Sequence, residues 1–127
     1  MRRSVVVAFL FASACTTQIE GRFIRTNPAP RPMPARAALS VQLYTSGHPE
    51  VAYTEIGVIE ERLVMGAPDD LLLALLMRMR EDAARRGCDA VVVGGDAEQP
   101  VTSAGRAEEH GFWGTCIVYD EPLSARR

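Results

Sequence analysis

The first fifteen residues, MRRSVVVAFLFASAC, constrain this chain more than any other stretch. Arg2 and Arg3 precede an apolar run, and Ala12, Ser13 and Ala14 follow it. A positive start, a short apolar centre and a small-residue cleavage site are the layout of a secretory signal peptide. The apolar run is much shorter than the roughly twenty residues that a transmembrane helix needs. We therefore predict that residues 1–14 are a signal peptide and are removed.

Cys15 stands where the cleavage must fall. Small residues followed at once by cysteine resemble the lipobox of bacterial lipoproteins, in which the sulfur receives a diacylglycerol and the new amine is acylated. One acyl chain binds a bilayer marginally, whereas two or more give lasting attachment. We predict a lipidated Cys15, and Thr16 in place of a retention aspartate implies the outer membrane, with the domain facing the periplasm. The alternative is an ordinary secretion signal followed by an incidental cysteine, which gives a soluble periplasmic or secreted protein.

Residues 15–38 read as a proline-rich tether, with Pro28, Pro30, Pro32 and Pro34 at alternate positions. Proline lacks an amide donor and biases its predecessor toward extended geometry, which excludes helix and favours polyproline II. At about 3.1 Å per residue, such a spacer would reach up to roughly 70 Å from the membrane. Its three large apolar residues either touch the membrane or pack on the domain, and the sequence does not decide between these: Ile19, Phe23 and Ile24.

Composition predicts one small, mildly acidic domain. Loss of residues 1–14 leaves 113 of the 127 residues and changes the formal net charge from −2 to −4, because that segment carries two arginines and no acid. This size corresponds to one domain. A nucleic-acid-binding domain would present a clustered basic surface, and we therefore expect no nucleic-acid partner.

Residues 39–123 predict an α+β domain of order β-β-α-β-β, one helix packed on a short sheet, and residues 124–127 are a tail. Alternation in ALSVQLY and β-branched residues in YTEIGVIEERLV predict two strands, the second bulged at Gly57. The helix begins near Pro68 and ends at Gly87. The apolar runs in CDAVVVGG and GTCIVYD predict the last two strands. One helical face should carry the core stripe, namely Leu72, Leu75, Leu76, Met79 and Ala83.

Cys88 and Cys116 are the remaining cysteines, in a compartment where disulfides form. If the last two strands pair as a hairpin with Gly94 near Trp113, Cys88 falls opposite Tyr119. That register predicts cysteines too far apart for a bridge, whose α carbons must lie within about 7 Å. A disulfide therefore remains the lesser alternative.

The segments YTEIGVIEE, RRGCDAVVVGG and GTCIVYD resemble the small envelope domain of the YbjQ-like proteins and of the outer-membrane lipoprotein that senses damage for the Rcs phosphorelay. The matching positions are structural ones: Ile56, Gly57, Gly87, Asp89, Ala90, Val91 and Gly114. The resemblance implies the fold, and with it we expect a protein-interaction or an envelope stress-sensing module. It supplies no catalytic residues.

No chemical motif accompanies these patterns. The candidate metal ligands are His48, His110, Cys88 and Cys116, and no two have the short spacing of a zinc site. We predict no metal, no cofactor and no enzymatic activity. The long connection DAEQPVTSAGRAEEHGF is either disordered or a docking site whose apolar end is Phe112 and Trp113.

The sequence thus predicts a membrane-anchored periplasmic lipoprotein that contacts an unidentified envelope protein without catalysis. The alternatives are a secreted domain that forms homo-oligomers, and a module that binds a metal or a small molecule.

Overall fold

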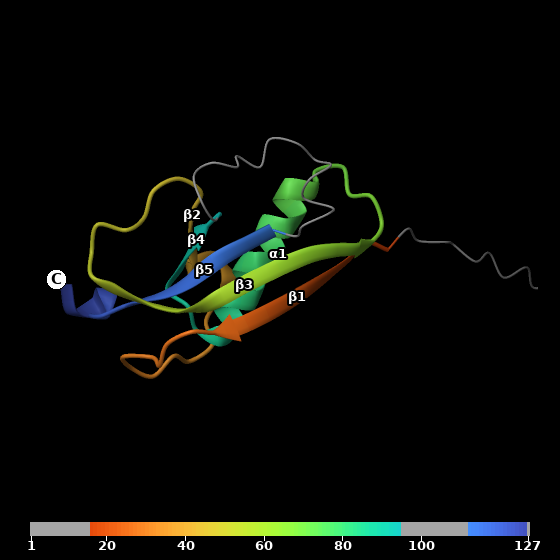
Figure 1. Ribbon diagram of the computed structural model, residues 1–127. Coiled ribbons are helices and arrows are strands. Elements are labelled where there is room, and N and C mark those ends of the chain that lie inside the picture. The colour runs from red at the N-terminus through yellow and green to blue at the C-terminus, as the bar shows by residue number, and fades with distance from the viewer. Residues whose placement is uncertain (1–15, 95–111, 127) are drawn as a thin grey trace, which may run out of the picture.

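The computed structural model describes residues 16–94 and 112–126, and it shows the expected small α+β domain with one helix packed on a sheet (Figure 1). The strands form one five-stranded sheet of order β1-β3-β5-β4-β2. The strands are β1 (Gln18–Arg25), β2 (Gln42–Tyr44), β3 (Tyr53–Met65), β4 (Ala90–Val93) and β5 (Phe112–Tyr119). The helix is α1 (Leu71–Arg86), and the short 3-10 turns are η1 (Ala38–Ser40) and η2 (Leu123–Arg126). Within the described ranges no helix is long and apolar enough to cross a membrane.

The ends of α1 follow the local sequence signals. The Asp70 side chain accepts a hydrogen bond from the Leu73 amide at 3.0 Å and caps the first turn. Gly87 closes the last turn in the left-handed conformation, at a φ of 78°. Of the predicted core stripe, Leu75, Met79 and Ala83 are buried and Leu76 packs against them, whereas Leu72 is 39% exposed. The assignment of Leu72 to the core is therefore wrong.

The strands that flank the helix are also confirmed. β3 pairs antiparallel with β5, and the register shifts between Glu55 and Gly57, where the bulge was predicted. β4 pairs antiparallel with β5, and β2 lies parallel to β4. The core lies between α1 and the sheet and includes Ile56, Ile59 and Val91, all fully buried.

The predicted tether is in large part folded, which corrects the domain boundary at residue 39. β1 forms the edge of the sheet beside β3, with Gln18 opposite Met65 and Arg25 opposite Gly57. Ile19 and Phe23 pack against the core, which decides the question that the sequence left open for them, whereas Ile24 remains 42% exposed. The strand was missed because a single apolar alternation beside a proline-rich stretch resembles a linker. A spacer of roughly 70 Å over these residues is excluded, because the domain begins at Gln18.

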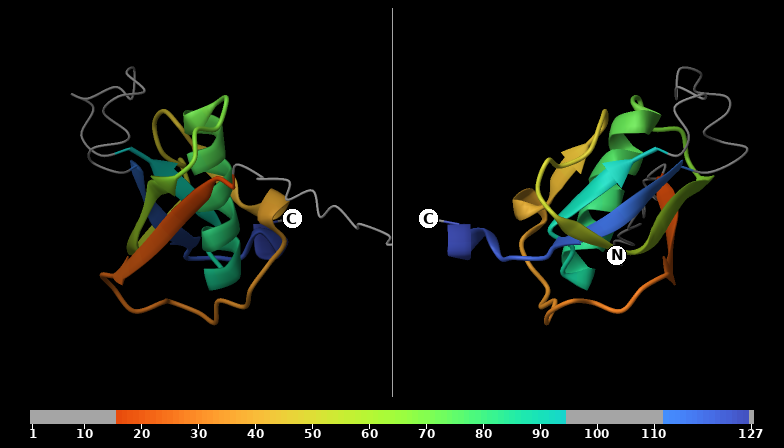
Figure 2. Two further views of the ribbon diagram at one scale, coloured as in Figure 1. Left: turned by 90° about the vertical axis from the view of Figure 1, so that its right-hand side faces the viewer. Right: turned by 60° about the vertical axis from the view of Figure 1, so that its left-hand side comes forward.

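The proline-rich residues cross the C-terminal end of α1 as a strap, by which we mean residues 26–41 (Figure 2). The Arg36 amide donates to the Ala84 carbonyl at 3.0 Å, and thus to the last turn of the helix. A methyl group at Gly87 would collide with the Met33 carbonyl oxygen, so the strap fits only against glycine. The absence of amide donors at the prolines costs little stability here, because the strap does not pair with a strand of the sheet.

Candidate functional site

One face of the sheet carries α1, and the opposite face of β1, β3 and β5 is the candidate interaction surface. Side chains alternate along each strand, so Cys116 and Val118 of β5 point to the helix and Trp113 points away from it. Trp113 is 40% exposed. Tryptophan is costly to leave in water and is enriched at the energetic centres of protein interfaces.

Charged side chains of β3 and β1 lie on one side of Trp113. Glu60 of β3 stands directly opposite Trp113, and Arg22 of β1 is opposite Glu60 on the other side. Glu20 and Arg62 form the next cross-strand pair. We name this surface the open face and define it by the residues Glu20, Arg22, Glu60, Arg62 and Trp113. An exposed aromatic residue beside charges of both signs is suited to a polypeptide partner rather than to a polyanion.

On the face away from α1, the other end of the sheet is covered by side chains. Ala90, Ile117 and Tyr119 form a second buried cluster, covered by Tyr44, Val51 and Tyr53. The exposed part of the sheet is therefore the half that contains Trp113.

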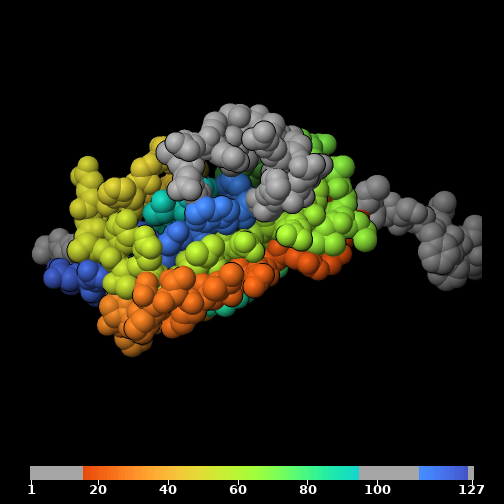
Figure 3. Space-filling model, viewed as in Figure 1, coloured from red at the N-terminus to blue at the C-terminus, as the bar shows by residue number. Residues whose placement is uncertain are grey.

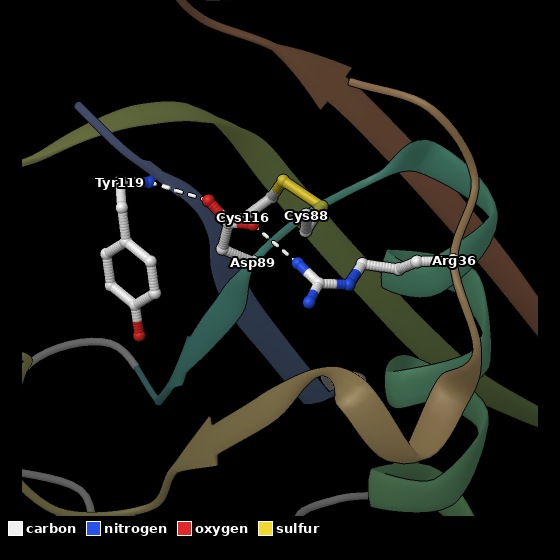
Figure 4. Close-up of a disulfide and its surroundings, with 5 residues drawn as sticks. All are labelled: Arg36, Cys88, Asp89, Cys116 and Tyr119. Carbon is white, nitrogen blue, oxygen red and sulfur yellow. Dashed lines mark hydrogen bonds and ion pairs between the residues drawn. A yellow bond between two sulfur atoms is a disulfide. The ribbon is translucent and has the colours of Figure 1, made fainter. Parts of the chain in front are cut away.

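Asp89 joins the strap to the sheet (Figure 4). Its carboxylate, 8% exposed, accepts bonds from Arg31 Nη2 and Arg36 Nη1, each at 2.5 Å, and from the Tyr119 amide at 2.8 Å. The neighbouring Arg31 Nε donates to the Tyr119 carbonyl at 3.2 Å. A buried carboxylate that receives three donors is fully paired, which makes Asp89 a structural anchor.

Cys88 and Cys116 form a disulfide, with α carbons 5.6 Å apart (Figure 4). The expected register is confirmed, with Val91 opposite Cys116, and yet the expected separation is wrong. Cys88 follows the cap of α1, and its amide still donates to the Ala83 carbonyl, whereas β4 begins only at Ala90. The chain turns at this point and brings Cys88 over β5. The bridge also removes both sulfurs from the candidate metal ligands.

Glu61 is a charged group that the sequence did not single out. It lies in β3 on the face toward α1, fully buried, and neither carboxylate oxygen has a hydrogen-bond partner among the described residues. Burial raises the pKa of its carboxyl from 4.5 to about 7, against the opposing effect of Arg78, Arg85 and Arg86. The signal available in the sequence was an acid at a core-facing position of a strand.

Gly21 of β1 creates the space above Glu61. A methyl group there would collide with the Asp82 carboxylate and would lie 3.0 Å from Glu61 Oε2. Beside it a pocket of about 50 Å³ is lined by backbone and side chains of both layers: Gly21, Arg22, Ile59, Arg78, Asp82 and Arg86. Arg86 covers it from one side and stacks on Phe23, its guanidinium carbon 4.3 Å from the ring centre. This volume suits one or a few waters and is too small for an organic substrate.

Glu61 should make the domain less stable as the pH rises. An unfolded chain releases this proton near pH 4.5, whereas the folded domain retains it to about pH 7. The free energy of unfolding should therefore fall by about 3 kcal/mol between these values, because the folded state binds the proton more tightly. Glu61→Gln should remove this fall and be the more stable protein at pH 8. Urea unfolding at pH 5 and pH 8 measures both.

Glu60→Gln is the matched control. Glu60 is adjacent in the chain but lies on the open face, so its variant should keep the wild-type pH dependence. Equal slopes in wild type and Glu61→Gln would show that the buried carboxyl does not cause the effect.

Phe112 is buried in the core and is unavailable to a partner, whereas Trp113 is exposed. His48 lies in a loop against Tyr53, with ring centres 6.3 Å apart. Cys15, His110 and most of the long connection lie outside the described residues. No group of three or more metal-binding side chains occurs in residues 16–94 and 112–126.

The positions that carried the family resemblance have structural roles. Gly57 is at the bulge of β3, Gly114 pairs with Val93, and Asp89 anchors the strap. The chain matches no family model and no curated protein. Among solved structures, the Francisella virulence factor FvfA aligns at 12% identity with a TM-score of 0.46, covering 82% of this chain and 100% of that chain. No functional statement follows from similarity at this level.

Proposed function

We propose that this chain is a lipid-anchored envelope protein whose domain binds another envelope protein through the open face, without catalysis. The observation that carries the proposal is the buried Cys88–Cys116 disulfide. Such bridges persist in oxidising compartments such as the periplasm, which agrees with the export signal read in residues 1–14.

The open face supports the interaction part of the proposal. Trp113 is exposed near the start of β5, and Glu60 of β3 lies opposite it, with Arg22 of β1 beyond Glu60. The buried acid Glu61, in contrast, lies behind β1 beside a pocket of about 50 Å³, and it offers no room for a substrate. Anchoring adds to a weak interface by raising the effective concentration of the domain near its partners.

Radiolabelled palmitate tests the anchor. The natural chain should incorporate label and Cys15→Ser should not, because acylation requires that sulfur. An unlabelled natural chain that is released by osmotic shock would overturn the lipoprotein assignment.

Photo-crosslinking in cells tests the interface. A photoreactive phenylalanine analogue at position 113 should capture one discrete envelope protein, and the same analogue at position 39 should not. Leu39 is the matched control, because it is 83% exposed and belongs to η1 rather than to the open face. Crosslinks between copies of this chain would instead favour a homo-oligomer, and equal capture at both positions would exclude a specific surface.

A further inference from the structure

The end of the domain at which β1 begins carries an apolar rim. We define the rim by four exposed residues, Val64 and Met65 at the end of β3 and Leu72 and Leu73 in the first turn of α1. Their exposed fractions lie between 39% and 59%. Figure 2 looks directly onto this end in its left view, and Figure 3 shows the surface of residues 60–70 beside the start of β1.

The chain reaches the predicted anchor from the same end. Gln18 pairs with Met65, and a methyl group at Gly66 would lie 2.7 Å from the Thr17 α carbon, so residues 16–17 run alongside the rim. Cys15 precedes Thr16 directly. Three residues span at most about 10 Å when fully extended. The headgroup region of each leaflet is about 5–7 Å thick, so a lipid on Cys15 would hold the rim close to the membrane surface.

We propose that the rim inserts shallowly into the bilayer that holds Cys15, so that the domain is docked on the membrane rather than suspended from it. This inference rests on the proposed lipid anchor. Apolar side chains at a headgroup boundary gain free energy in proportion to the area that they bury. The rim adjoins Asp69 and Asp70, and no basic residue lies between Val64 and Leu73, which favours a zwitterionic over an anionic surface.

A synthetic anchor tests the contact independently of lipidation in the cell. Cys15 is the one cysteine outside the disulfide, so the full chain from Cys15 onward can be coupled through it to a maleimide phospholipid in phosphatidylcholine vesicles. Trp113→Phe removes the single tryptophan, and Leu73→Trp adds a reporter at the rim. Lipids brominated near the headgroup end of the acyl chains should quench this reporter several-fold more than a reporter at position 123, in η2.

Polar substitutions separate insertion from mere proximity. Val64→Ser combined with Met65→Ser should lower the quenching at position 73 several-fold, because insertion requires the apolar side chains. The matched control is Ile24→Ser, which changes an exposed residue at the other end of β1 and should leave the quenching unchanged.

Equal quenching at positions 73 and 123, or none at either, would overturn the inference even if palmitate labelling succeeds. A reporter at position 73 that is shielded from water, unquenched by brominated lipid and crosslinked between copies would overturn it in favour of a dimer through the rim. A chain that lacks palmitate in cells but inserts in this assay would overturn only the anchor.

Discussion

Replacing both Cys88 and Cys116 with alanine is expected to lower the free energy of unfolding by about 3.5 kcal/mol, the chain-entropy value for a closed loop of this length. The two residues are 28 positions apart in sequence, so the bridge restricts a substantial part of the unfolded chain. The loss is large for this protein, because small domains have only about 5–15 kcal/mol to begin with. Urea unfolding of the double variant and of the wild type, at pH 5 where Glu61 is protonated, measures the difference.

Reduction of the wild type supplies the control. A reducing agent should lower its stability to nearly that of the double variant and should leave the variant unchanged. Because cysteine and alanine pack differently, the double variant does not isolate the effect of the bond by itself. Reduction of the wild type does, because it changes only the bond. If the reducing agent changes neither protein, or if labelling finds both thiols free in chain exported to the periplasm, the bridge is not formed there and the support for an oxidising compartment is lost.

The disulfide also shows how far sequence reasoning extends in this fold. Local patterns predicted α1, the pairing of β4 with β5 and the bulge at Gly57, because caps, periodicity and glycine act within a few residues. The register that places Val91 opposite Cys116 followed from the hairpin. The error was to continue the strand back to Cys88, whose amide is still bonded to the helix at Ala83. The rise per residue of a strand can be used to place residues only in the part of the chain that is extended.

β1 and most of the strap were predicted to be a tether, and this prediction was wrong for a different reason. Their structure depends on contacts with residues far along the chain, such as the pairing of Phe23 with Ile59 and of Arg36 with Asp89. Composition alone makes such a segment look like a linker, since nothing local marks an edge strand that is completed by a distant partner. One residue of the open face, Trp113, was predicted from the sequence. The charged residues beside it could not be predicted, because their positions depend on the order of the strands in the sheet.

The burial of Glu61 could have been suspected from the sequence, but its effect on the pH dependence of stability could not. Alternation in β3 places it on the same face as Ile59, where an acid is unexpected. That neither of its oxygens is paired depends on Gly21 and on the position of α1 above it, and both are tertiary facts. The direction of its pH effect therefore comes from the fold.

Asp89→Ala is expected to destabilise the domain by about 3 kcal/mol, near the lower end of the range for breaking a buried ion pair. Three donors lose their acceptor, and one of them is the backbone amide of the buried Tyr119. The loss is limited because Arg31 and Arg36 are 25% and 28% exposed and can be hydrated in part. Chemical denaturation measures the loss, and hydrogen exchange should show faster exchange of the Arg36 amide, which bonds Ala84.

Asp120→Asn is the matched control for that variant. Asp120 is an exposed aspartate at the end of β5 that accepts one hydrogen bond, from Thr54, and its substitution should change stability by less than about 0.5 kcal/mol.

Unchanged exchange at Arg36 in Asp89→Ala would mean that the proline-rich strap is held by its packing on Gly87 and not by the carboxylate. Accelerated exchange there, with β1 still protected, would show that the strap opens separately from the edge strand. The strand that lies next to Cys15 would then remain docked while the strap moves, so the position of the domain relative to its anchor would depend on the pairing of β1 with β3 and not on Asp89.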